Sequence, residues 1–204
     1  WRMMLRRYAE AALAVLPAIW ERGISASLAA VIPDLPASLP EALTRVIQNI
    51  NSDPNPADRP RIAAALARAQ GTAVHAPALL RDLVQLLALR HPAAGPMQKD
   101  AYANAALALA RRRPREAFVQ LLAAKTLLNL HPYDWWQAGG RPQPWTPLIE
   151  GLLRRALALD PGQPGAHHYW IHLQESSPRP ARADASAGFL RHAYPGVPHL
   201  LHMP

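Results

Sequence analysis

Cysteine is absent from this 204-residue chain, and several other residue types are scarce. Without cysteine there are no disulfides, no thiolate metal ligands and no cysteine nucleophile. Only two phenylalanines occur, and runs of β-branched residues are nearly missing, which argues against a substantial sheet. The sequence therefore excludes disulfide-stapled and thiol-based proteins and disfavours sheet-rich ones.

Long apolar runs are missing as well. The longest candidate, AALAVLPAIW at 11–20, is interrupted by Pro17 and has charged residues on both sides, so we predict no membrane span. No secretory signal is visible, although the chain begins at Trp1 rather than methionine. We expect a soluble protein, either cytoplasmic or exported with its signal removed, and the sequence does not decide between them.

The residues that are abundant favour helix. Half of the chain is apolar and rich in alanine and leucine, and most of the 22 prolines stand where a helix could begin or has just ended. Apolar periodicity predicts an amphipathic helix at 115–130 whose face includes Phe118, Leu121, Leu122, Lys125 and Leu128. The other predicted helices are 4–17, 24–32, 40–50, 59–70, 76–90, 97–111, 147–159, 164–176 and 179–194, with a further one beginning at Val197.

Short helices separated by proline turns suggest an array of helical hairpins. Pro161 and Pro195 are 34 residues apart, which is the tetratricopeptide period, and each opens a similar segment. In that register Ala156 and Ala183 occupy the small-residue position between paired helices. We expect an all-α fold of antiparallel helix pairs in a right-handed, tetratricopeptide-like superhelix. The match is incomplete, because histidine and glutamine stand at the usual tryptophan and tyrosine positions, His167 and Gln174.

An aromatic insert at 131–147, HPYDWWQAGGRPQPWTP, interrupts the helices. It is too irregular for a helix and too aromatic for a flexible linker, so we expect an ordered loop. One hypothesis is a pocket for a ligand or a proline-rich peptide; the other, which we favour, is a plug at the end of a hairpin. The candidate ligand-binding residues are Tyr133, Asp134, Trp135, Trp136 and Trp145, with Tyr169 from the following segment.

Histidines gather near the end of the chain, with six of the nine in the last 38 residues. In GAHHYWIHLQES the spacing puts His168, His172 and Glu175 on one helix face, and His199 and His202 are three residues apart in PHLLHMP. If stacked helices bring the two groups together, these five side chains could bind a divalent transition metal, zinc, iron or copper. The competing interpretation is a hydrogen-bonded packing network that includes Tyr169 and Trp170.

Arginine outnumbers lysine twenty to two, and the densest cluster is Arg111, Arg112, Arg113 and Arg115. Such a cluster could meet an anionic partner such as nucleic acid, but no aromatic residues interleave with it and no nucleic-acid motif surrounds it. We therefore favour a solvated helix end and expect no nucleic-acid partner. Nucleophile elbows and glycine-rich phosphate loops are absent from the sequence, so those enzyme classes are set aside.

Several segments together resemble a family of bacterial tetratricopeptide-like proteins that carry a tryptophan-rich insert. The segments are LLNLHPYDWW, GRPQPWTP, LLRRALALDPGQPGAHHYWIHLQESSPRPARADA and HLLHMP. The resemblance covers about 98–204 and implies repeats there, with 1–97 a helical region that is only loosely repeat-like. His168, Tyr169, His172, Glu175, His199, His202 and Met203 match the family's motif positions. We expect a scaffold that binds a protein or peptide partner; the alternative is a metal-binding protein or metal-dependent enzyme that uses the C-terminal His/Glu cluster, and the sequence leaves open whether it is an enzyme.

Overall fold

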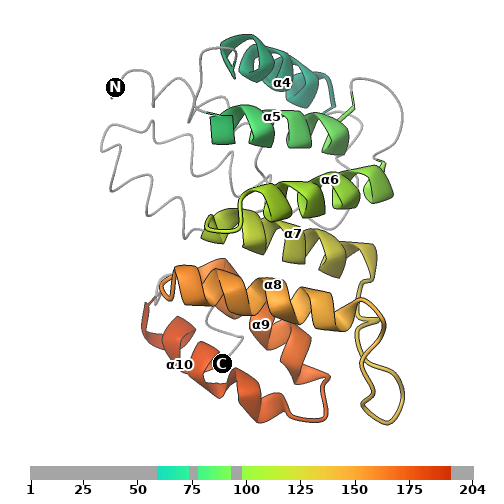
Figure 1. Cartoon of the computed structure of the whole chain (residues 1–204), viewed down its shortest axis with the longest axis vertical. Helices are drawn as coiled ribbons and strands as arrows, with labels where there is room; N and C mark the ends of the chain where they lie inside the picture. The colour runs from blue at the N-terminus through green and yellow to red at the C-terminus, as the bar shows by residue number, and fades with distance from the viewer. Residues whose placement is uncertain (1–58, 74–77, 93–97, 194–204) are drawn as a thin grey trace. The chain divides into compact units, whose positions relative to one another are not determined.

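The computed structural model describes residues 59–73, 78–92 and 98–193 (Figure 1). Throughout these ranges the fold is all-α: no strand occurs, and the sole β-type pairing is an isolated antiparallel bridge between Trp136 and Pro142. No helix in the described part is long and apolar enough to cross a membrane. The helices predicted before residue 58 and from Val197 lie outside the described residues. The chain divides into two compact units between Tyr102 and Ala103.

In the first unit α4 (Arg59–Ala73) packs against α5 (Ala78–Arg90). Both helices were predicted, at 59–70 and 76–90. Their buried side chains are Leu66 on α4 and, at helical spacing, Leu83, Val84, Leu86 and Leu87 on α5. Helix α6 (Lys99–Arg112) begins at the end of this unit. The Arg90 guanidinium lies 5.6 Å from the centre of the buried Tyr102 ring.

The second unit contains the rest of α6 and the helices that position the candidate site. These are α7 (Ala117–Leu130), α8 (Thr146–Leu159), α9 (Pro164–Glu175), the 3₁₀ turn η2 (Pro180–Ala183) and α10 (Asp184–Ala193). Each packs against the next along the chain, α7 on α8, α8 on α9, and α9 on η2 and α10 (Figure 1). Proline stands in the first turn of α8, α9 and η2, where its missing N–H costs no hydrogen bond. The helix predicted at 179–194 is thus two elements, a 3₁₀ turn followed by α10.

Helix α7 differs from the predicted amphipathic helix. All ten residues from Val119 to Leu128 are buried, so the helix is covered on every side rather than along one stripe. The apolar periodicity predicted only one buried face. The positions between the leucines hold alanine, glutamine and lysine, and the surrounding elements cover these side chains too. Buried alanines, Ala123 and Ala124, leave room for neighbouring backbones.

Two buried glutamines in this unit differ in their hydrogen bonding. The amide of Gln120 donates to Ala110 O at 3.0 Å and to Arg113 O at 3.1 Å, which ties the end of α6 to α7. Gln174 on α9 is fully buried, and among the described residues neither its amide nitrogen nor its oxygen has a hydrogen-bond partner. A buried polar group without a partner destabilises the fold by about 1–3 kcal/mol.

Substitution by methionine is therefore expected to have opposite effects at these two positions. Gln174→Met removes an unsatisfied amide at nearly constant volume and should raise the free energy of unfolding by about 1 kcal/mol. Gln120→Met removes two hydrogen bonds and should lower it by about 1–3 kcal/mol. Urea unfolding of both variants measures the difference, and a loss of stability at position 174 as large as that at position 120 would contradict this account.

Candidate functional site: the aromatic insert and the histidine helix

The insert between α7 and α8 is held by its tryptophans. Trp135 is buried, and its carbonyl oxygen accepts a hydrogen bond from the buried Thr146 hydroxyl. The Trp136 indole donates to Leu173 O on α9 at 2.7 Å. The Trp145 indole donates to Asp134 O at 2.7 Å, and its ring stacks on His131 with 3.7 Å between centroids. Trp135 and Trp136 thus hold the insert against the helices, and Trp145 ties the end of the insert to its beginning.

The backbone of the insert also closes on itself. Gln137 N donates to Arg141 O at 2.8 Å, beside the bridge between Trp136 and Pro142. The turn between them uses Gly139 and Gly140, both at positive φ. A Cβ at Gly140 would lie only 3.0 Å from the Pro178 side chain, so glycine is needed there both for its backbone angle and for space.

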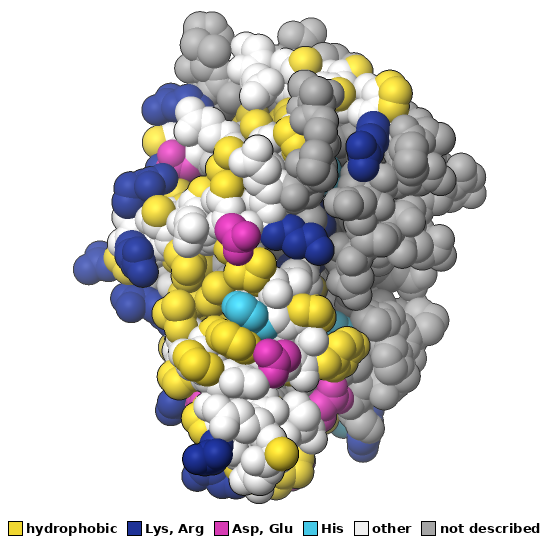
Figure 2. All heavy atoms as spheres, turned by 90° about the vertical axis from the view of Figure 1, so that its right-hand side faces the viewer, with side chains coloured by type: hydrophobic (Ala, Val, Ile, Leu, Met, Phe, Trp, Pro, Cys, Tyr) yellow, Lys and Arg dark blue, Asp and Glu magenta, His cyan; other side chains and the backbone are white. Residues whose placement is uncertain are grey.

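Tyr133 is the exception among the aromatic residues of the insert. Its φ is +58°, a left-handed conformation that is costly for a bulky residue, and 76% of its surface is exposed. Its ring centre is 5.4 Å from that of the buried Trp135, and the neighbouring Asp134 carboxylate accepts a hydrogen bond from Gln143 at 2.5 Å. Figure 2 shows the face that carries the insert, where hydrophobic side chains gather around histidine and acidic side chains. A fixed loop therefore presents one exposed aromatic ring.

Helix α9 brings His168, His172 and Glu175 close together. The rings of His168 and His172 meet edge to face with 4.6 Å between centroids, and His172 Nδ1 lies 3.0 Å from Glu175 Oε1. Because a carboxylate only accepts, Nδ1 carries the hydrogen, and Nε2 is the nitrogen of His172 that can accept a proton or bind a metal. His168 is buried, whereas His172 and Glu175 reach the surface.

Lys125 extends this polar group into the interior. This role was not predicted, because the apolar spacing of 115–130 puts Lys125 on a helix face with leucines. The lysine is only 2% exposed, and its Nζ lies 5.8 Å from the centre of the Tyr169 ring. Tyr169 in turn meets His168 edge to face at 5.0 Å. Lys125, Tyr169, His168, His172 and Glu175 thus form a continuous series from the buried side of α7 to the surface of α9.

His167 is adjacent in sequence but serves the packing of α9 against α10. Its Nε2 donates to Pro161 O at 2.8 Å, its Nδ1 lies 2.9 Å from the Ser186 hydroxyl, and its ring stacks on Phe189. Burial lowers the pKa of this imidazole, although the bond to Pro161 and the charge of Asp160 act in the opposite direction. With both nitrogens engaged, His167 is a structural residue.

A second structural group, also not predicted, joins α8, α9 and η2. The Trp170 indole donates to Arg182 O at 2.9 Å, and the Arg182 guanidinium lies 5.3 Å from the centre of the Trp170 ring. Arg182 is also hydrogen-bonded to the Glu150 carboxylate on α8. The sequence held no signal for this group, since its members lie 12 and 32 positions apart.

Three of the five predicted metal ligands lie within the described residues. His168, His172 and Glu175 adjoin each other, but no group of three or more His, Asp or Glu side chains within the described ranges is placed to hold a metal ion. The bond to His172 suits Glu175 as the residue that orients a ligand rather than as a ligand. His199 and His202 lie outside the described residues.

No family model matches this chain. Neither a curated protein nor a solved structure matches it either.

Proposed function

We propose that the chain is a tetratricopeptide-like helical scaffold that binds a protein or peptide partner through its aromatic insert. Supporting the repeat-like arrangement, consecutive helices of the second unit pack on one another. The alanines expected at the close helix contacts, Ala156 and Ala183, are buried. A rigid array of this kind presents an extended surface and needs no chemistry of its own.

The observation that carries the binding proposal is the conformation of Tyr133. Left-handed backbone at a bulky residue costs on the order of 1–2 kcal/mol, and a residue that packs little inside the protein does not repay that cost in stability. Exposed tyrosines are favoured anchors in interfaces, because they bury a large area with few rotatable bonds. Tyr133 therefore serves as the anchor for the partner, while Trp135, Trp136 and Trp145 hold the insert in place.

The substitution Tyr133→Gly separates binding from folding. Glycine adopts positive φ freely, so the variant should be about 1 kcal/mol more stable than the wild type. Peptides selected by the full chain from a displayed random-peptide library should bind the variant about 30-fold more weakly, as expected for loss of an anchor. Titration calorimetry and urea unfolding measure the two effects.

Tyr133→Phe is the matched control, because it keeps the ring and the left-handed backbone. It should retain most of the affinity for the selected peptides. The proposal fails if selection enriches no peptide, or if Tyr133→Gly binds the selected peptides as tightly as the wild type.

A second candidate function is metal binding by the histidine helix, favoured by the bond between His172 and Glu175. Carboxylates that hold one imidazole nitrogen commonly orient the other toward a metal. His172 Nε2 and His168 would be the ligands from α9, and His199 and His202 would complete the set. A metal held there would act as a Lewis acid toward bound water or a carbonyl group.

Zinc binding tests this alternative directly. If it holds, the full chain retains stoichiometric zinc after dialysis, measured by elemental analysis, and His172→Ala loses it. Glu175→Gln should weaken zinc affinity about 10–100-fold through the lost orientation of the imidazole. His192→Ala, at an exposed position on α10, is the control and should keep its zinc. A metal-free wild type excludes this function.

A further inference from the structure

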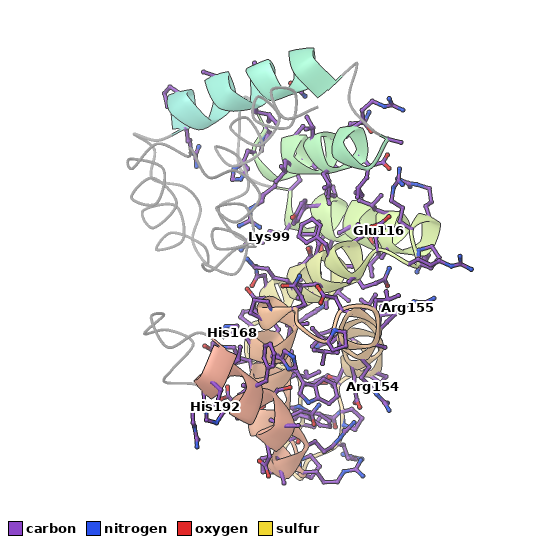
Figure 3. The ribbon with its side chains drawn as sticks, turned by 90° about the vertical axis from the view of Figure 1, so that its left-hand side faces the viewer. Lys99, Glu116, Arg154, Arg155, His168 and His192 are labelled. Carbon is purple, nitrogen blue, oxygen red and sulfur yellow. The ribbon has the colours of Figure 1, made fainter. Side chains whose placement is uncertain are left out.

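Six arginines from two distant segments form one face of the second unit, which we call the arginine face. They are Arg111, Arg112, Arg113 and Arg115 around the turn from α6 to α7, and Arg154 and Arg155 on α8. All are exposed except the half-buried Arg113. Arg155 Nε donates to Pro114 O at 2.8 Å, across 41 positions of sequence, and so joins the two segments. Figure 3 shows Arg154 and Arg155 on the same side as Glu116, with His168 and His192 on the opposite side.

Three of these cations, Arg111, Arg115 and Arg155, have no acidic partner within the described residues. The side chains of Arg111 and Arg115 make no hydrogen bond or ion pair there, and Arg155 uses only its Nε. Arg154 lies 3.8 Å from Glu150, a carboxylate that it shares with Arg182. Glu116, the acidic residue of the face, pairs with none of the arginines in the described part. Six arginines thus share this face with two carboxylates, those of Glu116 and Glu150, so the face has an excess of positive charge.

The side chains of the arginine face favour some classes of anionic partner over others. Guanidinium groups bind carboxylates and phosphates through paired N–H donors, and Arg155 keeps its two terminal nitrogens for such a contact. Single-stranded nucleic acid needs aromatic rings for base stacking. Trp145, which immediately precedes α8, is already stacked on His131, and Phe118, three residues after Arg115, is half-buried.

An apolar side chain at the edge of the arginine face helps to identify the class of anionic partner. Leu159 is exposed one turn beyond Arg155, at the end of α8. A membrane-surface helix would need a broad apolar face beside the basic residues, which the two exposed leucines of α8, Leu148 and Leu159, do not provide. An acidic peptide that carries an occasional leucine fits both features.

We propose that the arginine face binds an acidic peptide segment of a partner protein. Carboxylates of the segment pair with Arg111, Arg115, Arg154 and Arg155, and an apolar side chain lies against Leu159. The inference goes beyond the contact at Tyr133 and is independent of it. Tyr133 precedes the first turn of α8, whereas Arg154 and Arg155 lie in its second half.

A matched pair of triple variants tests the proposal. R111Q/R115Q/R154Q removes three charges from the face, and R141Q/R179Q/R191Q removes three exposed arginines elsewhere in the same unit. The probe is a fluorescent peptide of alternating glutamates and leucines, with the glutamine-for-glutamate peptide as its neutral counterpart. Fluorescence anisotropy on the full chain gives the dissociation constants, and circular dichroism verifies that both variants are folded.

The face variant should bind the acidic peptide about tenfold or more weakly than the wild type, and the control variant within about twofold of it. The neutral peptide should not bind, and raising NaCl from about 50 to about 300 mM should weaken the acidic complex. Equal losses in both triple variants would overturn the proposal, since they indicate only net charge. Tighter binding of a single-stranded RNA oligonucleotide or of phosphatidylserine vesicles than of the acidic peptide would also overturn it.

Discussion

Replacing Trp170 by alanine is expected to lower the free energy of unfolding of the second unit by about 3–5 kcal/mol. The ring is buried between α9 and η2, donates its N–H to Arg182 O and lies under the Arg182 guanidinium. Its loss leaves a cavity and an unsatisfied carbonyl, and it frees the arginine that reaches Glu150. Urea unfolding followed by far-UV circular dichroism measures the effect.

Trp170→Phe is the graded control for this prediction. It keeps most of the buried area but removes the indole N–H, so it should cost only about 1–2 kcal/mol. A measured loss for Trp170→Ala of less than about 1 kcal/mol in the free energy of unfolding would contradict the prediction, because the contact between α9 and η2 would then contribute little to stability.

The stability of the first unit is expected to fall as the pH is lowered, because of His91 at the end of α5. Burial, assisted by the charge of Arg90, lowers the pKa of His91 from 6.5 to about 4. Between these values the unfolded chain binds a proton that the native state does not, so stability is complete above pH 6.5 and declines toward pH 4. This difference in pKa contributes about 3 kcal/mol to the free energy of unfolding at pH values above 6.5.

Non-titrating replacements isolate this contribution. Both His91→Leu and His91→Gln should reduce the difference in free energy of unfolding between pH 7 and pH 4 by about 3 kcal/mol. Only leucine should also stabilise the protein at pH 7, because neither ring nitrogen of His91 has a hydrogen-bond partner in the described residues. An unchanged pH profile in both variants would show that His91 is protonated equally in the folded and unfolded states.

The positions of the helices in the described part were predictable from local sequence. Prolines at 147, 164 and 180 and the apolar spacing on α8 and α9 placed the helix starts within one or two residues. Helix α7 was predicted but its surroundings were not. Periodicity reports one covered face, whereas Gln120 and Lys125 are covered by elements from elsewhere in the chain.

The sequence was sufficient to predict which residues make up the candidate site, but not what each of them does there. Spacing alone placed His168, His172 and Glu175 together, and the density of tryptophans identified an ordered insert. Which aromatic residue is exposed depends on backbone angles that no local pattern encodes, such as the positive φ of Tyr133. The pairing of Arg155 with Pro114 is a product of the tertiary fold and has no local signal.

Amide chemical shifts of the isotope-labelled full chain can map where a selected peptide binds, and this tests most directly whether Tyr133 anchors the partner. Binding through the insert predicts that the shift changes concentrate at 131–145, with the largest next to Tyr133, and that the amides of His168 to Glu175 change little. Shifts confined to the histidine helix, with the insert unaffected, would contradict it.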